Sequence, residues 1–314
     1  MGRRNTFYFQ FPMSFKLINY SSQKGRTAIV TGANAGIGYE ITAGLASLDF
    51  KVIMACRNLG KAEKAKAKIS RRVPDADLEI MELDLSKLDS VRNFSKEFRS
   101  KYDQLDILIN NAGVLDYSGR KNEARIEIQF ATNHLGHFLL TKLLLEKMPD
   151  AAASRIVSMS SIAHKKSRIH FDDLNCENVK HPLAPYGQSK LACLMFGDEL
   201  HRRLKKANKS ILSISVHPGG SDSDLFDAMP RGQYIFFKIL SPFITHSNKS
   251  AAQSSLYAAL ESNLNGGEYF GPQGIMDLKG PVGIAKRSGY SKNEEIAGRL
   301  WEVSEEMVGE KFKV

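Results

Sequence analysis

The stretch Thr31-Gly32-Ala33-Asn34-Ala35-Gly36-Ile37-Gly38 lies between a short β-rich run, residues 27–31, and a segment with helical spacing of apolar residues, 37–48. Glycines at such a junction permit a tight turn and let the backbone approach a pyrophosphate, while the helix N-terminus supplies N–H groups. The spacing is G-x-x-x-G-x-G rather than the commoner G-x-G-x-x-G. The stretch predicts a turn that binds the phosphates of a dinucleotide through Gly32, Asn34, Gly36, Ile37 and Gly38.

Runs of apolar, β-rich residues alternate with segments of helical spacing along the rest of the chain. The β-type runs span residues 27–31, 50–56, 78–83, 105–110, 155–160, 211–217 and 268–270. Helical patterns cover residues 37–48, 59–72, 88–102, 130–148, 186–206 and about 250–260. Near-continuous apolar strands alternating with amphipathic helices are typical of a parallel sheet covered on both faces. We therefore predict an α/β fold, a single doubly wound Rossmann-type domain with a seven-stranded parallel sheet flanked by helices.

The domain is expected to span residues 25–314, after a basic and aromatic extension of residues 1–24. The first 39 residues hold five basic residues and no acidic one, with the aromatic stretch 7–11 between them. Three interpretations stay open: a disordered extension, a peripheral anchor on a membrane surface, or an organelle transit segment. The chain is expected inside the cell, in the cytoplasm or peripheral on a membrane.

The composition of the chain is that of a globular protein and does not indicate a nucleic-acid-binding protein. The chain of 314 residues is 42% hydrophobic and 25% charged, which is ordinary for a globular protein. The net charge of +10 is interpreted as solvated Lys and Arg on helix faces, because no nucleic-acid-binding motif accompanies it. The excess also suits an anionic cofactor or membrane surface.

Cysteine and histidine spacing predicts no metal site. Cys56, Cys176 and Cys193 are far apart and form no CxxC pair, which fits a reducing compartment and excludes a disulfide framework. His134 and His137 are three residues apart on a predicted helix, but no third ligand accompanies them, so we expect them to pack in the interior.

A homodimer is compatible with the sequence but not required by it.

The end of the second predicted strand bears on the choice of nucleotide. NAD-binding proteins place an Asp or Glu there to bond the ribose 2′-hydroxyl. This chain reads Ala55-Cys56-Arg57-Asn58, and Arg57 can pair with a 2′-phosphate. The cofactor is therefore predicted to be NADP(H) in preference to NAD(H).

Two further strand ends are candidates for cofactor contacts. Asp84 follows the third strand and could accept from the adenine amino group, whereas Ser86 is the better candidate to cap the next helix. Asn111, Ala112 and Gly113 follow the fourth strand, where small and amide residues suit close packing on the cofactor.

Tyr186 and Lys190 stand four residues apart at the start of a predicted helix, so both side chains lie on one face. A tyrosine with a pKa near 10 is a poor acid or base at pH 7. A neighbouring ammonium and a positive nicotinamide ring stabilise the phenolate and bring the pKa of the tyrosine down toward the working range. The pair thus predicts proton transfer beside a hydride donor.

Six segments in chain order together resemble the short-chain dehydrogenase/reductase family. They are TGANAGIG at 31–38, NNAG at 110–113, Asn133 in NHLGHF, SMSS at 158–161, YGQSK at 186–190 and HPGG at 217–220. The resemblance covers residues 27 to about 271. The finer details CRN, NHLGHFLLT, SIAH and SVHPG look most like the retinol dehydrogenase-like branch, whose members act on lipophilic carbonyls and alcohols.

The resemblance implies a role for each residue of the catalytic set. Tyr186 would be the general acid in reduction and the general base in oxidation, and Lys190 would lower its pKa and bind the nicotinamide ribose. Ser161, 25 residues before Tyr186, would bond the substrate oxygen in preference to Ser160. Asn133 would hold a water linking Lys190 to solvent, and a helix kink or cap is the alternative for Asn133.

The segment after HPGG departs from the family pattern and forms the predicted substrate side. Pro218 and Gly219 are expected against the nicotinamide, with Ser223 in place of the usual threonine. Residues 221–248 are rich in apolar side chains and are predicted to form a helical lid, whose inner face either binds a lipophilic substrate or simply packs on the body.

Two functions follow from these patterns. The first is an NADP-dependent oxidoreductase that interconverts a carbonyl and an alcohol on a lipophilic substrate, such as a retinal- or retinol-like molecule, a long-chain aldehyde or a steroid-like compound. The alternative is a nucleotide-binding regulator that acts through protein partners. The complete set of Ser161, Tyr186, Lys190 and Asn133 favours the enzyme.

Overall fold

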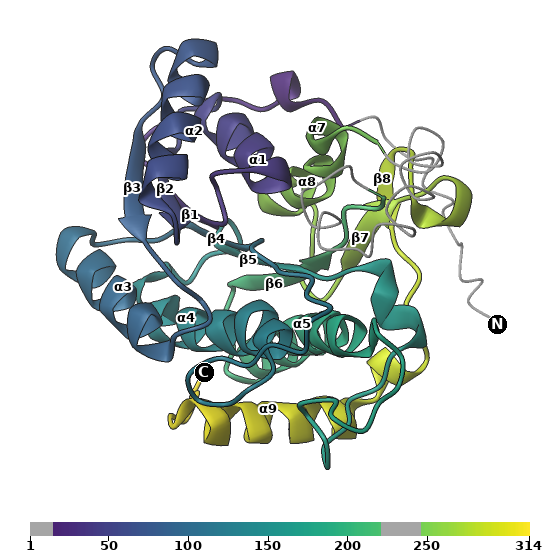
Figure 1. Cartoon of the computed structure of the whole chain (residues 1–314). Coiled ribbons are helices and arrows are strands. Elements are labelled where there is room, and N and C mark those ends of the chain that lie inside the picture. The colour runs from purple at the N-terminus through teal and green to yellow at the C-terminus, as the bar shows by residue number, and fades with distance from the viewer. Residues whose placement is uncertain (1–14, 221–245) are drawn as a thin grey trace.

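A computed structural model describes residues 15–220 and 246–314 (Figure 1). Eight strands form one sheet with the order β3-β2-β1-β4-β5-β6-β7-β8. The strands are β1 (Thr27–Thr31), β2 (Lys51–Cys56), β3 (Leu78–Glu82), β4 (Ile107–Asn110), β5 (Arg155–Met159), β6 (Leu212–Val216), β7 (Tyr269–Pro272) and β8 (Val282–Ile284). The order reverses between β1 and β4, and ligands bind at such a switch point, beyond the carboxyl ends of the strands.

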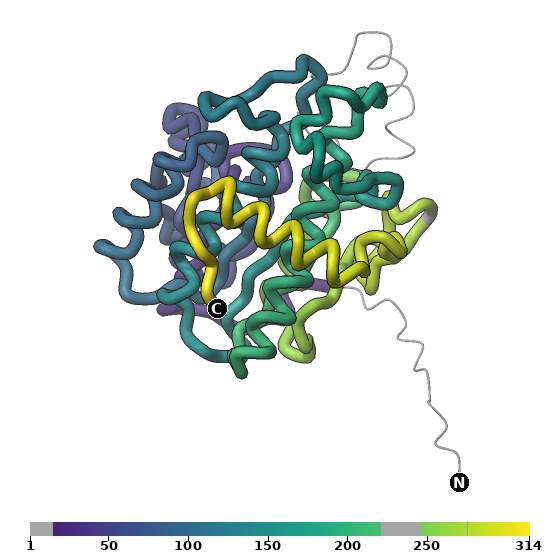
Figure 2. Tube along the Cα trace, turned by 90° about the horizontal axis from the view of Figure 1, so that it is seen from below, coloured from purple at the N-terminus to yellow at the C-terminus, as the bar shows by residue number. Residues whose placement is uncertain are grey.

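Helices cover both faces of the sheet. On one face lie α1 (Gly36–Ala46), α2 (Leu59–Arg72), α7 (Asn248–Ala251) and α8 (Gln253–Leu260). On the other lie α3 (Leu88–Lys101), α4 (Gly136–Leu144) and α5 (Ala184–Lys206), with α9 (Glu294–Val308) packed outside α5 (Figure 2). The predicted three-layer α/β architecture is therefore confirmed.

The core explains why the central strands are almost purely apolar. Every residue of β1, β4 and β5 is buried, because helices cover both faces of these strands. One apolar cluster fills the side of α3, α4, α5 and α9, and a second fills the side of α1, α2 and α8. Burying a Leu, Ile or Val side chain contributes roughly 1.5–3 kcal/mol to the stability of the fold. Each central strand is therefore stabilised by packing against the helices on both faces of the sheet.

The sheet has one more strand than predicted. The seven predicted strands are parallel, and β8 is an additional antiparallel strand beside β7, with Gly271 opposite Gly283. Only Val282 of the three residues in β8 is buried. A three-residue strand at the sheet edge cannot show an alternating pattern, which is why the sequence pattern did not reveal it.

Helix α9 also lies outside the predicted elements, although its sequence carries the signal of a helix. The Asn293 side chain caps the first turn by accepting from the Ile296 amide, and Glu294 and Glu295 follow in that turn. Trp301 is buried by Phe138, with ring centroids 5.1 Å apart. An N-cap followed by apolar residues at helical spacing could have predicted this helix.

The predicted helix 130–148 is broken into three parts. Its first six residues, Phe130–Leu135, form a π-helical turn that continues into α4, and the short 3₁₀ helix Leu145–Lys147 ends it. The segment after Ser247 likewise forms two helices, α7 and α8, in place of one. π turns are rare and occur often at functional sites, and here the turn contains Asn133.

Part of the predicted N-terminal extension contacts the body of the domain. Phe15, Leu17 and Tyr20 pack against the apolar cluster on the α1 side, and the Tyr20 hydroxyl donates to Glu261 Oε2 over 3.1 Å. No helix within residues 15–220 and 246–314 is long and apolar enough to cross a membrane. The predicted lid falls almost wholly on residues 221–245, outside the described residues.

Candidate active site

The glycine turn has the geometry that its sequence predicts. Gly32 adopts a φ of +67°, which side-chain-bearing residues rarely adopt. A Cβ on Gly38 would lie 2.2 Å from the Gly32 carbonyl oxygen, so only glycine fits there. Helix α1 then begins at Gly36, and no side chain caps its first turn. The uncapped N–H groups and the helix dipole make this turn a site for an anion such as a pyrophosphate.

The Asn111-Ala112-Gly113 segment is tied to the glycine turn by Thr31. The Thr31 hydroxyl oxygen accepts from the Asn111 and Ala112 amides over 3.0 and 2.9 Å. The Asn111 side-chain amide donates to the Thr31 carbonyl oxygen over 2.9 Å. Asn111 thus holds two strand ends together, and Thr31 is a structural member of the site that the sequence pattern did not single out.

Arg57 and Asp84 lie after β2 and β3, the strands on the β1 side of the switch point. Arg57 is exposed, and no residue in the described part of the chain forms an ion pair or hydrogen bond with its guanidinium. Asp84 Oδ1 accepts from the Ser86 amide and hydroxyl over 3.1 and 2.7 Å. The prediction that Ser86 caps the next helix is therefore wrong. Lys87 occupies the N-cap position, and Ser86 bonds Asp84 instead.

Tyr186 and Lys190 lie in the first two turns of α5, which has Pro185 in its first turn. Lys190 Nζ is 6.0 Å from the centroid of the Tyr186 ring. The ammonium also donates to the Met159 carbonyl oxygen at the end of β5, over 3.1 Å. Lys190 is buried, and no carboxylate of the described residues forms an ion pair with it. The two side chains share one helix face, as their spacing predicts.

Burial dominates the acidity of the tyrosine. It raises the pKa of Tyr186 to about 12, while a hydrogen bond with Ser161 acts in the opposite direction. In the protein without cofactor, desolvation disfavours the phenolate more than the polar neighbours stabilise it, and the lowering predicted for Lys190 together with the nicotinamide ring stays a prediction. Burial also lowers the pKa of Lys190.

Ser160 and Ser161 play different parts at the end of β5. Ser161 is near enough to Tyr186 to act against the rise in the pKa of Tyr186, and its Oγ accepts from the Ala163 amide over 3.2 Å. Ser160 is buried and donates to the Lys190 carbonyl oxygen over 2.8 Å. The structure therefore places Ser161, and not Ser160, at the tyrosine hydroxyl.

Asn133 is fully engaged inside the protein. Its Oδ1 accepts from the Val114 amide over 2.8 Å, and its Nδ2 donates to the Ser189 hydroxyl over 2.9 Å. Ser189 in turn donates to the Tyr186 carbonyl oxygen over 2.8 Å. Asn133 thus links the π turn to the first turn of α5, so the helix distortion weighed as an alternative is present.

Gly113 brings this loop against the lysine. A Cβ on Gly113 would lie 3.0 Å from Lys190 Nζ and 3.4 Å from Asn133 Oδ1. The two polar groups therefore face the same glycine, with no space for a side chain between them.

The two predicted interior histidines, His134 and His137, are hydrogen-bonded within the protein. His134 bonds the Ser304 hydroxyl over 2.7 Å, and His137 bonds the Asn133 carbonyl oxygen and the Thr31 hydroxyl over 2.9 Å each. Burial lowers the pKa of His134 to about 3 and that of His137 to about 4. Both rings are neutral packing groups of the core, as expected, and residues 15–220 and 246–314 contain no metal-binding cluster.

A cavity of about 1300 Å³ opens in front of the tyrosine. Ser161 and Tyr186 lie in its wall, together with Pro218, Gly219 and Gly220 from the segment after β6. Apolar groups in the described wall include Leu115, Tyr117, Ile162, Val179, Leu183, Met276 and Leu278, and basic groups there include Lys165, Lys166, Arg168 and Lys286. The volume exceeds the roughly 300–1,000 Å³ of ordinary small-molecule sites.

His246 is bonded to Pro218 and Gly220, two residues of the cavity wall. The His246 amide donates to the Gly220 carbonyl oxygen over 2.8 Å, and the His246 ring bonds the Pro218 carbonyl oxygen over 2.6 Å. Ser223, the predicted nicotinamide contact, lies outside the described residues.

Comparison with known proteins gives consistent results. Residues 26–233 match the family model of short chain dehydrogenases. Retinol dehydrogenase 11 of Homo sapiens is 38% identical over 285 residues, which cover 91% of this chain and 86% of that protein. The short-chain dehydrogenase TIC 32 B, chloroplastic, of Brassica napus is 37% identical over 295 residues, covering 91% of this chain and 89% of that one.

Solved structures share the fold. A crystal structure of an uncharacterised protein from Mycobacterium paratuberculosis is 34% identical, with a TM-score of 0.79, and covers 96% of this chain and 100% of that one. A short chain dehydrogenase from Shigella flexneri, solved in complex with NADP, has a TM-score of 0.63 at 21% identity and covers 78% of this chain and 96% of that one. The chain belongs to the short-chain dehydrogenase/reductase family, in its retinol dehydrogenase-like branch, and is an oxidoreductase of the kind that uses NAD(P) and acts on CH–OH groups.

Proposed function

We propose that the protein is an NADP-dependent oxidoreductase that interconverts a carbonyl and an alcohol on a lipophilic substrate, with Tyr186 as the proton donor in reduction. The observation that carries the proposal is that Ser161 and Tyr186 line the same large cavity, with Lys190 Nζ 6.0 Å from the centroid of the Tyr186 ring. A proton donor, a second hydroxyl and an ammonium together suit the reduction of a polarised carbonyl.

The residues present fit a nicotinamide dinucleotide. The uncapped first turn of α1 suits the pyrophosphate, and Arg57 suits a 2′-phosphate because it is exposed and has no ion-pair partner in the described ranges. Ala112 and Gly113 follow β4 at the switch point, Asp84 follows β3 at the same end of the strands, and Pro218 and Gly219 line the cavity beyond β6. When bound, the nicotinamide supplies the hydride.

The protein's own part in the reaction is to hold the carbonyl and to move a proton. Ser161 and Tyr186 both donate hydrogen bonds to the substrate oxygen, and as that oxygen gains negative charge the Tyr186 hydroxyl gives up its proton to it. Lys190 then faces a phenolate, and the attraction between the two charges stabilises it. In oxidation the same phenolate takes the proton from the alcohol.

The pKa of Tyr186 determines whether its hydroxyl is protonated at neutral pH. Burial is the largest of the causes that raise the pKa of Tyr186 to about 12, so the protein without cofactor keeps the hydroxyl protonated at neutral pH. A protonated tyrosine is the form that carbonyl reduction needs.

The water relay predicted for Asn133 belongs to this proposal. Its side-chain oxygen already accepts from the Val114 amide and its side-chain nitrogen already donates to Ser189. Asn133 can therefore hold such a water only through hydrogen bonds additional to these two. Its direct effect is to fix the first turn of α5, and with it Tyr186.

The wall of the cavity supports a lipophilic substrate. Leucine, isoleucine, valine and methionine side chains from separate segments line it together with basic side chains of Lys165, Lys166, Arg168 and Lys286, and its volume admits a long-chain or polycyclic molecule. The retinol dehydrogenase names of the relatives point to the same substrate class.

A substrate panel tests the proposal. Purified protein is incubated with NADPH and, in turn, retinal, a long-chain aldehyde, a steroid ketone and a small polar ketone, and product alcohol is quantified by chromatography. We expect the lipophilic carbonyls to be reduced with a kcat/KM at least tenfold above that of the polar ketone. A preference for the polar ketone would overturn the substrate class, and no alcohol from any member would overturn the proposed reaction.

A further inference from the structure

The turn that carries Ser161 is bonded to a buried histidine that has no part in the proposed chemistry. His164 lies in the short 3₁₀ helix Ile162–Lys166, and none of its surface is exposed. Its Nδ1 is 2.6 Å from the Ser161 carbonyl oxygen, and its Nε2 is 3.4 Å from the Ser288 amide nitrogen. One ring therefore joins the Ser161 turn to the segment before α9.

These contacts determine where the proton on the ring lies. A carbonyl oxygen only accepts, so His164 Nδ1 must carry the hydrogen; an amide N–H only donates, so His164 Nε2 must be bare. Burial lowers the pKa of His164, in keeping with a neutral ring. His164 is thus a fixed donor aimed at the main chain of Ser161.

Tyr269 extends the contacts of this histidine to β7. Its hydroxyl lies 3.4 Å from His164 Nδ1, and the centroids of the two rings are 5.4 Å apart. Because Nδ1 carries the hydrogen, the Tyr269 oxygen can only share it as a second acceptor beside the Ser161 carbonyl oxygen. The His164 ring therefore contacts both the Ser161 turn and β7.

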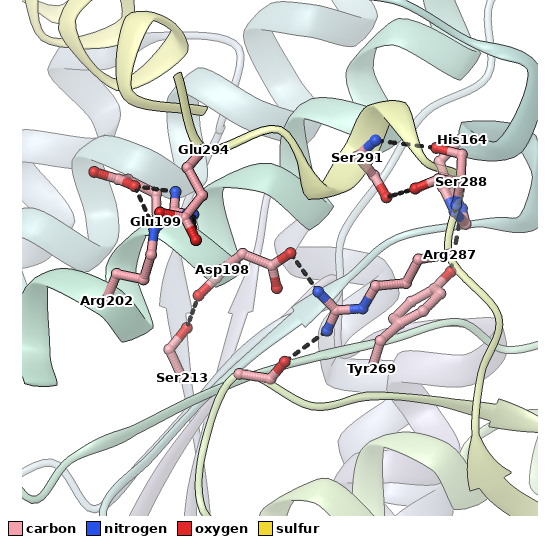
Figure 3. A network of polar contacts seen from close by, with 12 residues as sticks. His164, Asp198, Glu199, Arg202, Ser213, Tyr269, Arg287, Ser288, Ser291 and Glu294 are labelled. Atoms are coloured by element: carbon pink, nitrogen blue, oxygen red, sulfur yellow. Dashed lines mark hydrogen bonds and ion pairs between the residues drawn. The ribbon is translucent and has the colours of Figure 1, made fainter. Parts of the chain in front are cut away.

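An ion pair holds the far end of the network in place (Figure 3). Arg287 lies over the Tyr269 ring, 5.6 Å from its centroid, and pairs with Asp198 on α5. The same guanidinium donates to the Gly267 carbonyl oxygen over 2.6 Å. Asp198, Arg287 and Tyr269 thus fasten α5, the segment before β7 and β7 itself around His164.

We propose that His164 is a positioning residue that holds Ser161 in hydrogen-bonding distance of the substrate oxygen and of Tyr186. The role of Ser161 at the substrate oxygen is the one given under Proposed function, on which this inference rests. His164 touches neither reactant. It acts through the Ser161 main chain, and a donor displaced by about 1 Å can lower the rate of a reaction by up to about 100-fold.

Two amide variants separate the two bonds of the ring. In His164→Asn the amide nitrogen reaches the position of Nδ1 and can still donate to the Ser161 carbonyl oxygen, whereas in His164→Gln the amide reaches the position of Nε2 and can still accept from Ser288. His164→Ala loses both bonds. All three variants lose the ring contact with Tyr269, whose centroid lies 5.4 Å away, so they share the cost in packing.

The experiment measures carbonyl reduction and hydrogen exchange of residues 161–167 for the wild type and the three variants. We expect kcat to fall about 10- to 100-fold in His164→Ala and His164→Gln, and at most about threefold in His164→Asn, with KM for NADPH unchanged. Exchange of the Ala163 amide, which bonds Ser161 Oγ, should rise in the first two variants only. Equal kcat and equal exchange in the Asn and Gln variants would overturn the inference.

The two readouts keep this inference distinct from the proposed function. If the wild type reduces no carbonyl while the exchange pattern follows the prediction, the proposed reaction is wrong and the positioning of Ser161 stands. If the wild type is active and kcat in His164→Ala equals that of the wild type, the inference is wrong and the reaction stands. Tyr269→Phe gives a second check, because it keeps the ring and removes only the hydroxyl, and it should lower kcat less than His164→Ala.

Discussion

The cofactor preference depends on one exposed arginine, which makes Arg57 the place to perturb it. Arg57 follows β2 directly, and within the described ranges its guanidinium has no ion-pair partner to lose. A charge-assisted hydrogen bond contributes about 1.5–3 kcal/mol when desolvated, and solvent around an exposed arginine reduces this to about 1–2 kcal/mol. We therefore expect Arg57→Ala to lower kcat/KM for NADPH about 5- to 30-fold.

The same substitution should leave the reaction with NADH nearly unchanged, because NADH has no 2′-phosphate. Arg57→Asp should go further, since a carboxylate repels the phosphate and can bond a ribose 2′-hydroxyl. We expect it to favour NADH over NADPH. The effect of Arg57→Ala should also shrink as ionic strength rises, because salt screens an exposed pair.

Steady-state kinetics with both cofactors and one saturating aldehyde measure these ratios. Arg71→Ala is the matched control: Arg71 is exposed in the last turn of α2, and the helix separates it from Arg57 by roughly 20 Å. It should change neither ratio by more than about twofold. Equal losses with NADPH and NADH in Arg57→Ala, or a wild type that prefers NADH, would refute the assignment of the 2′-phosphate to Arg57.

Three further predictions concern the active site, the pH dependence of stability and the core. Gly113→Ala should lower kcat about tenfold, because its Cβ would lie 3.0 Å from the buried Lys190 ammonium, whereas Gly298→Ala on α9, with no atom within 4 Å, should leave kcat unchanged. Burial lowers the pKa of His217 to about 3, below the value near 6.5 of the unfolded chain, so its contribution to stability is present above pH 6.5 and is lost as the pH falls, by about 2 kcal/mol at pH 5. Thermal unfolding at several pH values should show this fall, and His217→Gln should reduce it; an unchanged slope would contradict the assignment. Trp301→Ala should cost about 3–5 kcal/mol in denaturant unfolding, because Trp301 is buried between α9 and its neighbours, and a loss below 1 kcal/mol would show that α9 does not pack as described.

Much of the fold could be predicted because its signals are local. Glycine spacing, strand-length apolar runs and helical periodicity each depend on a few neighbouring residues, and they identified the seven parallel strands and the doubly wound order. Strand β8 escaped because three edge residues carry no periodicity. Helix α9 is different: the cap at Asn293 and the acidic first turn were visible in the sequence.

The candidate site was less predictable where contacts join distant segments. Tyr186 and Lys190 share a face because four residues make about one helical turn, so their spacing was enough. The bond from Lys190 to the Met159 carbonyl oxygen depends on how α5 packs on β5, which no local pattern encodes. The effect of burial on the pKa of Tyr186 is equally hard to predict from the sequence, since burial is a property of the whole fold.

The central claim is that Tyr186 delivers the proton while Lys190 and Ser161 support it, and single-turnover reduction by Tyr186→Phe tests it most directly. The variant keeps the ring that lies 6.0 Å from Lys190 Nζ and removes only the hydroxyl. With NADPH prebound and a lipophilic aldehyde added, we predict a rate lower by about 10²- to 10⁴-fold, while the Kd for NADPH stays within about threefold of the wild-type value. A rate equal to that of the wild type would contradict the account.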